Sequence, residues 1–162
     1  MMGISETTPE GKTLRFWTRW LLVVSVLMVV LGLFMVVLGF LPEKPEGDPI
    51  IQAFWGAKLP AGPTAAFFSW MFAVWGSTMV GWGVTLFYVA RYAFAQKLRW
   101  ARRGLLVSLA LWYPIDTLAS AFFGVWFNVG LNTTFLLLAL APVVGTWRHF
   151  SADVGGASKP EA

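Results

Sequence analysis

The chain has 162 residues, of which 57% are hydrophobic and only 12% are charged, whereas soluble domains average about one quarter charged residues. A soluble fold of this size could not bury so much apolar surface, so lipid must be part of its solvent. The absence of cysteine excludes disulfides, thiol chemistry and thiolate metal sites. The net charge of +4 comes from basic residues outside the apolar runs, so nucleic acid is not an expected partner.

Four apolar runs predict membrane-spanning helices, because each is near the roughly 20 residues that cross about 30 Å of hydrocarbon. The predicted spans cover about residues 16–41, 65–90, 104–127 and 131–147. They form a transmembrane domain, residues 16–150, between two tails, residues 1–15 and 151–162. The predicted fold class is all-α, an integral membrane four-helix antiparallel bundle.

Basic residues gather on one side of the predicted spans. Ten of the twelve Lys and Arg residues precede the first span, join the second to the third or follow the fourth, and only Lys44 and Lys58 lie elsewhere. The positive-inside rule then predicts that both termini are cytoplasmic. This pattern favours a multi-pass protein of a bacterial inner (cytoplasmic) membrane over an organellar one, with membrane lipids as partners.

The first outer loop, residues 42–64, contains a predicted short amphipathic helix. Asp48 suits the N-cap, Pro49 the first helical position and Gly56 the stop. Its apolar residues lie on one side: Ile50, Ile51, Phe54 and Trp55. We expect this segment to lie in the outer membrane interface as an aromatic anchor, or over a cavity between the spans as a lid.

Small residues recur at regular intervals in the first two spans. In the first span they repeat every seven residues: Ser25, Gly32 and Gly39. In the second they repeat every four: Ala73, Ser77, Gly81 and Thr85. Small side chains let two backbones approach closely, so these faces are expected to pack the two spans together or to form a homo-oligomer contact.

Asp116 is the one ionisable residue clearly inside a predicted span. It lies 12 residues from Gly104 and 11 from Phe127, which is about 17 Å from either end of that span. An ionised carboxylate near mid-membrane costs about 2.5 to 3.5 kcal/mol. Pro114 removes a backbone hydrogen bond two residues earlier, so one interpretation is that the carboxylate repairs the broken helix. It would donate to a carbonyl of the preceding turn or cap the half-helix that follows.

The other interpretation is a functional polar site around this carboxylate. Trp112 and Ser120 lie four residues away on either side and share its helix face, and Tyr113 is close in angle. Residues of the second and fourth spans join them if those spans face the same interior. The candidates for a ligand or proton site are therefore Asp116, Trp112, Tyr113, Ser120, Ser77 and Asn132. Such a site would bind a proton, a cation or the polar head of an apolar molecule.

Three tryptophans lie deeper in the predicted spans than the others: Trp75, Trp82 and Trp112. Each indole N–H needs a hydrogen-bond acceptor when it is buried. We therefore expect these side chains to line the bundle interior rather than to face lipid.

The sequence leaves three function classes open. No catalytic residue, metal site or cofactor is predicted, because His149 lies beyond the last span and Asp116 has no second acid or base near it. The first hypothesis is a non-enzymatic binding or accessory protein that holds a lipid-like ligand or a partner's transmembrane helices, in a homo-oligomer or a larger membrane complex. The second is a proton-coupled small-molecule transporter that uses Asp116. The third is a membrane enzyme that acts on an apolar substrate.

Overall fold

The computed structural model describes residues 9–41, 47–56 and 61–150. Within these ranges the chain is helical, with the elements α1 (Pro9–Phe40), α2 (Pro49–Trp55), α3 (Pro63–Tyr88), the π-helical η1 (Val89–Phe94), α4 (Arg99–Phe122), α5 (Trp126–Gly145) and the 3-10 helix η2 (Trp147–Phe150). Four helices are long and apolar enough to cross a membrane: Gly11–Phe40, Pro63–Phe94, Arg99–Phe122 and Trp126–Gly145. The predicted all-helical class and its four apolar spans are confirmed. The first two spans extend further than expected.

α1 and α3 form the first helix pair and pack through facing small residues. The predicted seven-residue repeat of α1 is confirmed as the contact, and it meets a second seven-residue repeat on α3: Ser69, Gly76 and Gly83. A Cβ atom on Gly32 would come within 2.6 Å of the Gly76 carbonyl oxygen. A side chain would not fit at Gly32 or at Gly76, so glycine at both positions lets the two helix backbones come into contact.

As a contact with α1, the predicted face of α3 is wrong from Ser77 onward, while its alternative role as a homo-oligomer contact stays a prediction. Ser77, Gly81 and Thr85 are exposed, and no atom of another segment lies within 4 Å of a Cβ built on Gly81. A four-residue repeat turns by about 40° around the helix at each step, whereas a seven-residue repeat turns by only about 20° at each of its longer steps. Only the seven-residue repeat therefore stays against α1 along its whole length.

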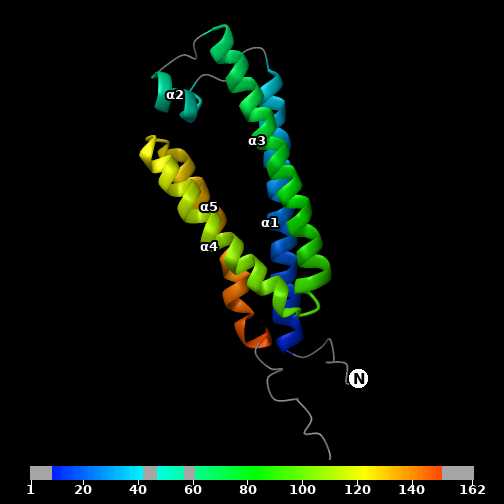
Figure 1. Ribbon diagram of the computed structural model, residues 1–162. Coiled ribbons are helices and arrows are strands. Elements are labelled where there is room, and N and C mark those ends of the chain that lie inside the picture. Colours follow the sequence, from blue (N-terminus) through cyan, green and yellow to red (C-terminus); the bar gives the residue numbers. More distant parts are fainter. Residues whose placement is uncertain (1–8, 42–46, 57–60, 151–162) are drawn as a thin grey trace, which may run out of the picture.

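α4 and α5 form the second helix pair, which diverges from the first (Figure 1). The two pairs meet in a core of buried side chains from α1, η1, α4 and η2, which we call the junction: Leu14, Leu21, Ala90, Ala93, Phe94, Ala101 and Phe150. Near this end the Trp20 indole N–H donates to the Leu138 carbonyl oxygen of α5 at 2.9 Å. The chain is therefore arranged as two helix pairs joined at one end.

α2 has the caps that the sequence predicted. The Asp48 side chain accepts hydrogen bonds from the backbone N–H groups of Ile50 at 2.9 Å and Ile51 at 3.1 Å. Gly56 ends the helix with a φ of 82°, in the left-handed region that favours glycine. The predicted helix over these residues is confirmed.

α2 contacts both helix pairs at the end far from the junction (Figure 1). Ile51 is buried with Phe68 and Phe72 of α3. On the other side the ring of Phe54 lies 6.2 Å from the ring of Phe123, which directly follows α4. α2 therefore bridges the two diverging pairs.

The connection between α4 and α5 lies earlier than predicted. α4 ends at Phe122 and α5 begins at Trp126, whereas the predicted spans end at 127 and begin at 131. Gly124, with a φ of 73°, supplies the left-handed turn between them. As a result Asn128, which the sequence analysis assigned to the connection, lies in the first turn of α5.

Candidate functional site

Asp116 accepts hydrogen bonds from side chains of two helices. The Trp112 indole N–H donates to Oδ2 at 3.1 Å, and the Asn128 amide of α5 donates to Oδ1 at 3.0 Å. The Ser120 hydroxyl, one turn later in α4, lies 2.7 Å from the Asp116 carbonyl oxygen and 3.2 Å from Oδ1. We call Trp112, Asp116, Ser120 and Asn128 the Asp116 network.

Asn128 closes this network. Its Nδ2 also lies 2.8 Å from the Ser120 hydroxyl oxygen, so one amide group contacts the side chains of both Asp116 and Ser120. The single hydroxyl hydrogen of Ser120 is shared between the Asp116 carbonyl oxygen at 2.7 Å and Oδ1 at 3.2 Å, and the hydroxyl oxygen accepts from Asn128. The three side chains that contact the carboxylate oxygens are all uncharged. The network thereby ties α4 to α5.

The position of Asp116 along its helix differs from the prediction. α4 runs from Arg99 to Phe122, so Asp116 lies 6 residues, about 9 Å, from one end and 17 residues, about 26 Å, from the other. The predicted mid-span position is wrong because the helix begins and ends five residues earlier than the apolar run. Asp116 lies near the end of α4 that α2 approaches.

The carboxylate also differs from both predicted backbone repairs. Its oxygens accept from side chains, and α4 continues through Pro114 to Phe122. Asp116 therefore links two helices instead of capping a half-helix.

Two more polar pairs continue the seam between α4 and α5. The Tyr113 hydroxyl lies 3.2 Å from the Thr133 hydroxyl. The Asn132 amide lies 3.4 Å from the Thr117 hydroxyl, and the Asn132 side chain is buried. Tyr113 and Asn132 thus belong to the same seam as Asp116 but bond to other partners.

Ser77 lies apart from this seam. It is exposed on α3, and its hydroxyl donates to the Val74 carbonyl oxygen of its own helix at 2.9 Å. α3 packs chiefly against α1. The structure therefore brings Asp116, Trp112 and Ser120 together and leaves Ser77 out.

Asn128 is the member of the network that the sequence analysis missed. It lies four residues before Asn132, so the two amides share one face once the segment is helical. That spacing was the available signal. It was hidden because residue 128 lies between the predicted spans, which end at 127 and begin at 131.

Trp75 and Trp82 lie in the middle of the span Pro63–Phe94. Trp75 is 12 residues from Pro63 and Trp82 is 12 residues from Phe94, about 18 Å from the nearer end in each case. Their side chains are 48% and 53% exposed, and neither indole N–H has an acceptor among the residues that the structure describes. Neither tryptophan is therefore fully buried or hydrogen-bonded through its indole within the described residues.

Helical spacing places these two tryptophans on the side of α3 that runs from α2 to the junction. Phe68, Trp75, Trp82 and Val89 follow one another at seven-residue intervals and therefore lie along one side of α3. Phe68 is only 2% exposed beneath α2, and Val89 packs against the junction. This side of α3 is covered at both ends and open in the middle.

α1 shows the same pattern, and α4 contributes the partly buried Trp112. Leu31 is 37% exposed, although Val24, seven residues earlier, is buried and Leu38, seven residues later, packs against the α2 cluster. Trp112 lies seven residues after Leu105, which packs against the junction. We call the resulting set the interpair surface: Leu31, Trp75, Trp82 and Trp112.

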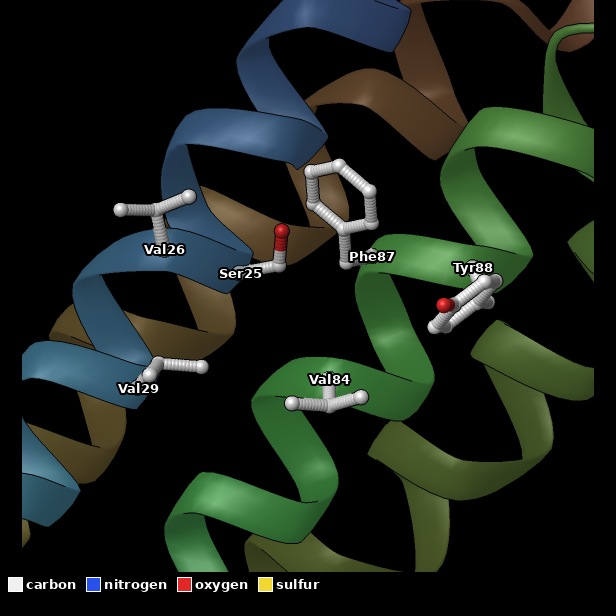
Figure 2. A pocket seen from close by; sticks show the side chains of 6 residues that line it. All are labelled: Ser25, Val26, Val29, Val84, Phe87 and Tyr88. Atoms are coloured by element: carbon white, nitrogen blue, oxygen red, sulfur yellow. The ribbon is translucent and has the colours of Figure 1, made fainter.

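A separate shallow depression lies on the seam between α1 and α3 (Figure 2). Its lining comes from both helices: Ser25, Val26, Val29, Val84, Phe87 and Tyr88. The Ser25 hydroxyl donates to the Leu22 carbonyl oxygen at 2.7 Å, and the Tyr88 ring stacks on Tyr92 at 5.8 Å. Its lining contains no charged group, and the hydroxyl hydrogen of Ser25 is already used within its own helix. The depression therefore offers little for specific recognition.

The chain matches no protein-family model, curated protein or solved structure. Among the described side chains, no three of His, Cys, Asp and Glu are grouped as metal ligands. The geometry of the Asp116 network and of the interpair surface is therefore the basis for assigning a function.

Proposed function

We propose that the chain is a small multi-pass protein of the inner membrane that binds a lipid-like molecule between its two helix pairs and catalyses no reaction. In this proposal the four spans cross the membrane antiparallel, both termini lie in the cytoplasm and α2 lies in the outer interface. The observation that carries the proposal is the interpair surface, where Leu31, Trp75 and Trp82 are exposed at mid-span while α1 and α3 are covered at both ends of the surface.

The dimensions of this surface support a ligand that lies along the spans. The covered residues Phe68 and Val89 are 21 positions apart, or about 32 Å along α3. This length matches the roughly 30 Å hydrocarbon core of a bilayer. Binding sites for small apolar molecules are lined mainly by apolar and aromatic side chains, as this surface is.

A transporter that uses Asp116 has weaker support. The donors to its carboxylate are side chains of the same chain, and together they join α4 to α5. Acids inside a membrane are functional hypotheses by default, but this one already has a structural task.

The proposal is tested on the protein purified in mild detergent, by native mass spectrometry and by extraction of bound lipids. We expect a reproducible apolar molecule in the wild type that is lost from the double variant Trp75→Ala/Trp82→Ala. The matched control is Trp100→Ala/Trp126→Ala, which removes two exposed tryptophans at the starts of α4 and α5 and should retain the molecule.

Two results would contradict ligand binding. The first is bare protein in several mild detergents, with both double variants indistinguishable from the wild type. The second is a dimer or a co-purifying membrane protein that disappears only with the Trp75 and Trp82 substitutions, because a partner helix would then occupy the interpair surface.

A further inference from the structure

The two indoles at the centre of α3 are donors without acceptors. Trp75 and Trp82 lie seven residues apart on one side of the helix, so their positions are separated by about 10 Å and lie about 5 Å on either side of the span's midpoint. In hydrocarbon an N–H group without an acceptor costs free energy, and water is not there to supply one. Phenylalanine would give the same apolar surface without this cost.

From these donors we infer that the ligand of the interpair surface carries an uncharged hydrogen-bond acceptor, such as a carbonyl oxygen, midway along an elongated apolar body. This inference rests on the proposed function and specifies its ligand. The acceptor would bond to the indole N–H of Trp75 or Trp82, and the apolar arms would lie along α3 toward α2 and toward the junction.

Groups of the chain itself do not serve these donors. The Asp116 carboxylate already accepts from Trp112 and Asn128. The hydroxyl of Thr78, which lies between the two tryptophans, donates to the Val74 carbonyl oxygen of its own helix. No described group of the chain accepts from either indole, so a bound molecule is the source of the acceptor in this inference.

The depth of the indoles disfavours the ester groups of an ordinary phospholipid. The ester oxygens of such a lipid lie near the interface, whereas Trp75 and Trp82 are each seven residues, about 10 Å along the helix, inside the Phe68–Val89 length that matches the hydrocarbon core. An intact partner helix is also a poor source, because its backbone carbonyl oxygens are already bonded within the helix. An anionic acceptor is unsuitable because the interpair surface contains no cationic side chain.

The test compares two probes of equal length, hexadecane and its mid-chain ketone hexadecan-8-one. The full chain is labelled with ¹⁵N-tryptophan and placed in phosphatidylcholine nanodiscs, and each indole resonance is assigned by a Trp→Phe substitution. We expect the ketone to shift the Trp75 and Trp82 N–H signals, and to bind about three- to tenfold more tightly than hexadecane.

The double variant Trp75→Phe/Trp82→Phe keeps both aromatic rings but removes both donors. We expect it to bind the two probes equally, while Trp100→Phe keeps the preference for the ketone. If the double variant does not fold, the wild-type preference and the two indole shifts still decide the outcome.

Failure of this inference and failure of the proposed function give different results. Equal binding of ketone and hexadecane by the wild type, with no indole shift, would overturn the acceptor and leave ligand binding intact. Binding of neither probe to the wild type would overturn the proposed function and this inference together.

Discussion

Replacing Asn128 with alanine should loosen α5 from α4. The substitution removes the donor 3.0 Å from Asp116 Oδ1 and the contact of 2.8 Å to the Ser120 hydroxyl. It leaves the partly buried carboxylate with the Trp112 indole and the Ser120 hydroxyl as its donors. Asn128 is not at the interpair surface, so the expected effect is on stability.

The magnitude follows from two bounds. Hydrogen bonds to charged groups contribute about 1.5 to 3 kcal/mol, whereas side-chain hydrogen bonds between membrane helices average about 0.6 kcal/mol and reach about 1.7 kcal/mol. For Asn128→Ala we expect a loss of about 1 to 2 kcal/mol in the free energy of unfolding. In a double-mutant cycle with Asp116→Ala, the coupling energy should be about 1 kcal/mol.

The assay is reversible unfolding in mixed detergent micelles, followed by circular dichroism. Thr134→Ala is the matched control, because this exposed hydroxyl donates to the Gly130 carbonyl oxygen of its own helix. The double variant Asp116→Asn/Asn128→Asp exchanges the two side chains. It should be more stable than the sum of its two single substitutions predicts, since an amide and a carboxylate again face each other. Additive single-variant effects, with no recovery in the exchange, would show that the network does not join the two helices.

Two further predictions concern other contacts. Gly32→Ala should lower the free energy of unfolding by about 1 to 3 kcal/mol, because its Cβ would meet the Gly76 carbonyl oxygen, while Gly81→Ala should be neutral or stabilising. The thermal midpoints of the two variants in detergent measure these effects. Equal effects of the two substitutions would refute the assigned contact between α1 and α3. Arg102→Lys should cost about 0.5 to 1 kcal/mol and speed hydrogen exchange in η2, because Arg102 stacks 4.2 Å from the Trp147 ring and donates to its carbonyl oxygen at 3.1 Å. Unchanged exchange would show that this contact does not hold η2.

Hydropathy predicted which segments are helices better than where they end. The four apolar runs are helical because only a helix satisfies its own backbone in hydrocarbon. Their ends depend on local groups instead. α1 begins at Pro9, within a stretch that carries Lys12 and Arg15, because a helix can continue beyond the apolar run that a hydropathy window detects. Gly124 ends the α4 region earlier than hydropathy indicates, because its turn follows from backbone conformation.

Partner faces were harder to predict than helices. The repeat on α1 was recognised, but α3 carries two sets of small residues, and a single helix does not reveal which set meets a neighbour. The choice depends on the match to α1, and only the set with Gly76 and Gly83 keeps the same spacing. Asn128 was missed for a related reason, since its partner on α4 becomes visible only when α5 is known to begin at Trp126.

The Asp116 network and the two central tryptophans of α3 therefore favour different roles. Asp116 drew attention because an intramembrane acid is costly, yet its donors come from Trp112, Ser120 and Asn128, so its cost is offset within the chain. Trp75 and Trp82 are ordinary residues by composition, yet their N–H groups have no such partner in the described part of the chain. In a solvent that cannot supply hydrogen bonds, the unmet donor is the group that a ligand can stabilise. The search for a ligand should therefore begin at these indoles.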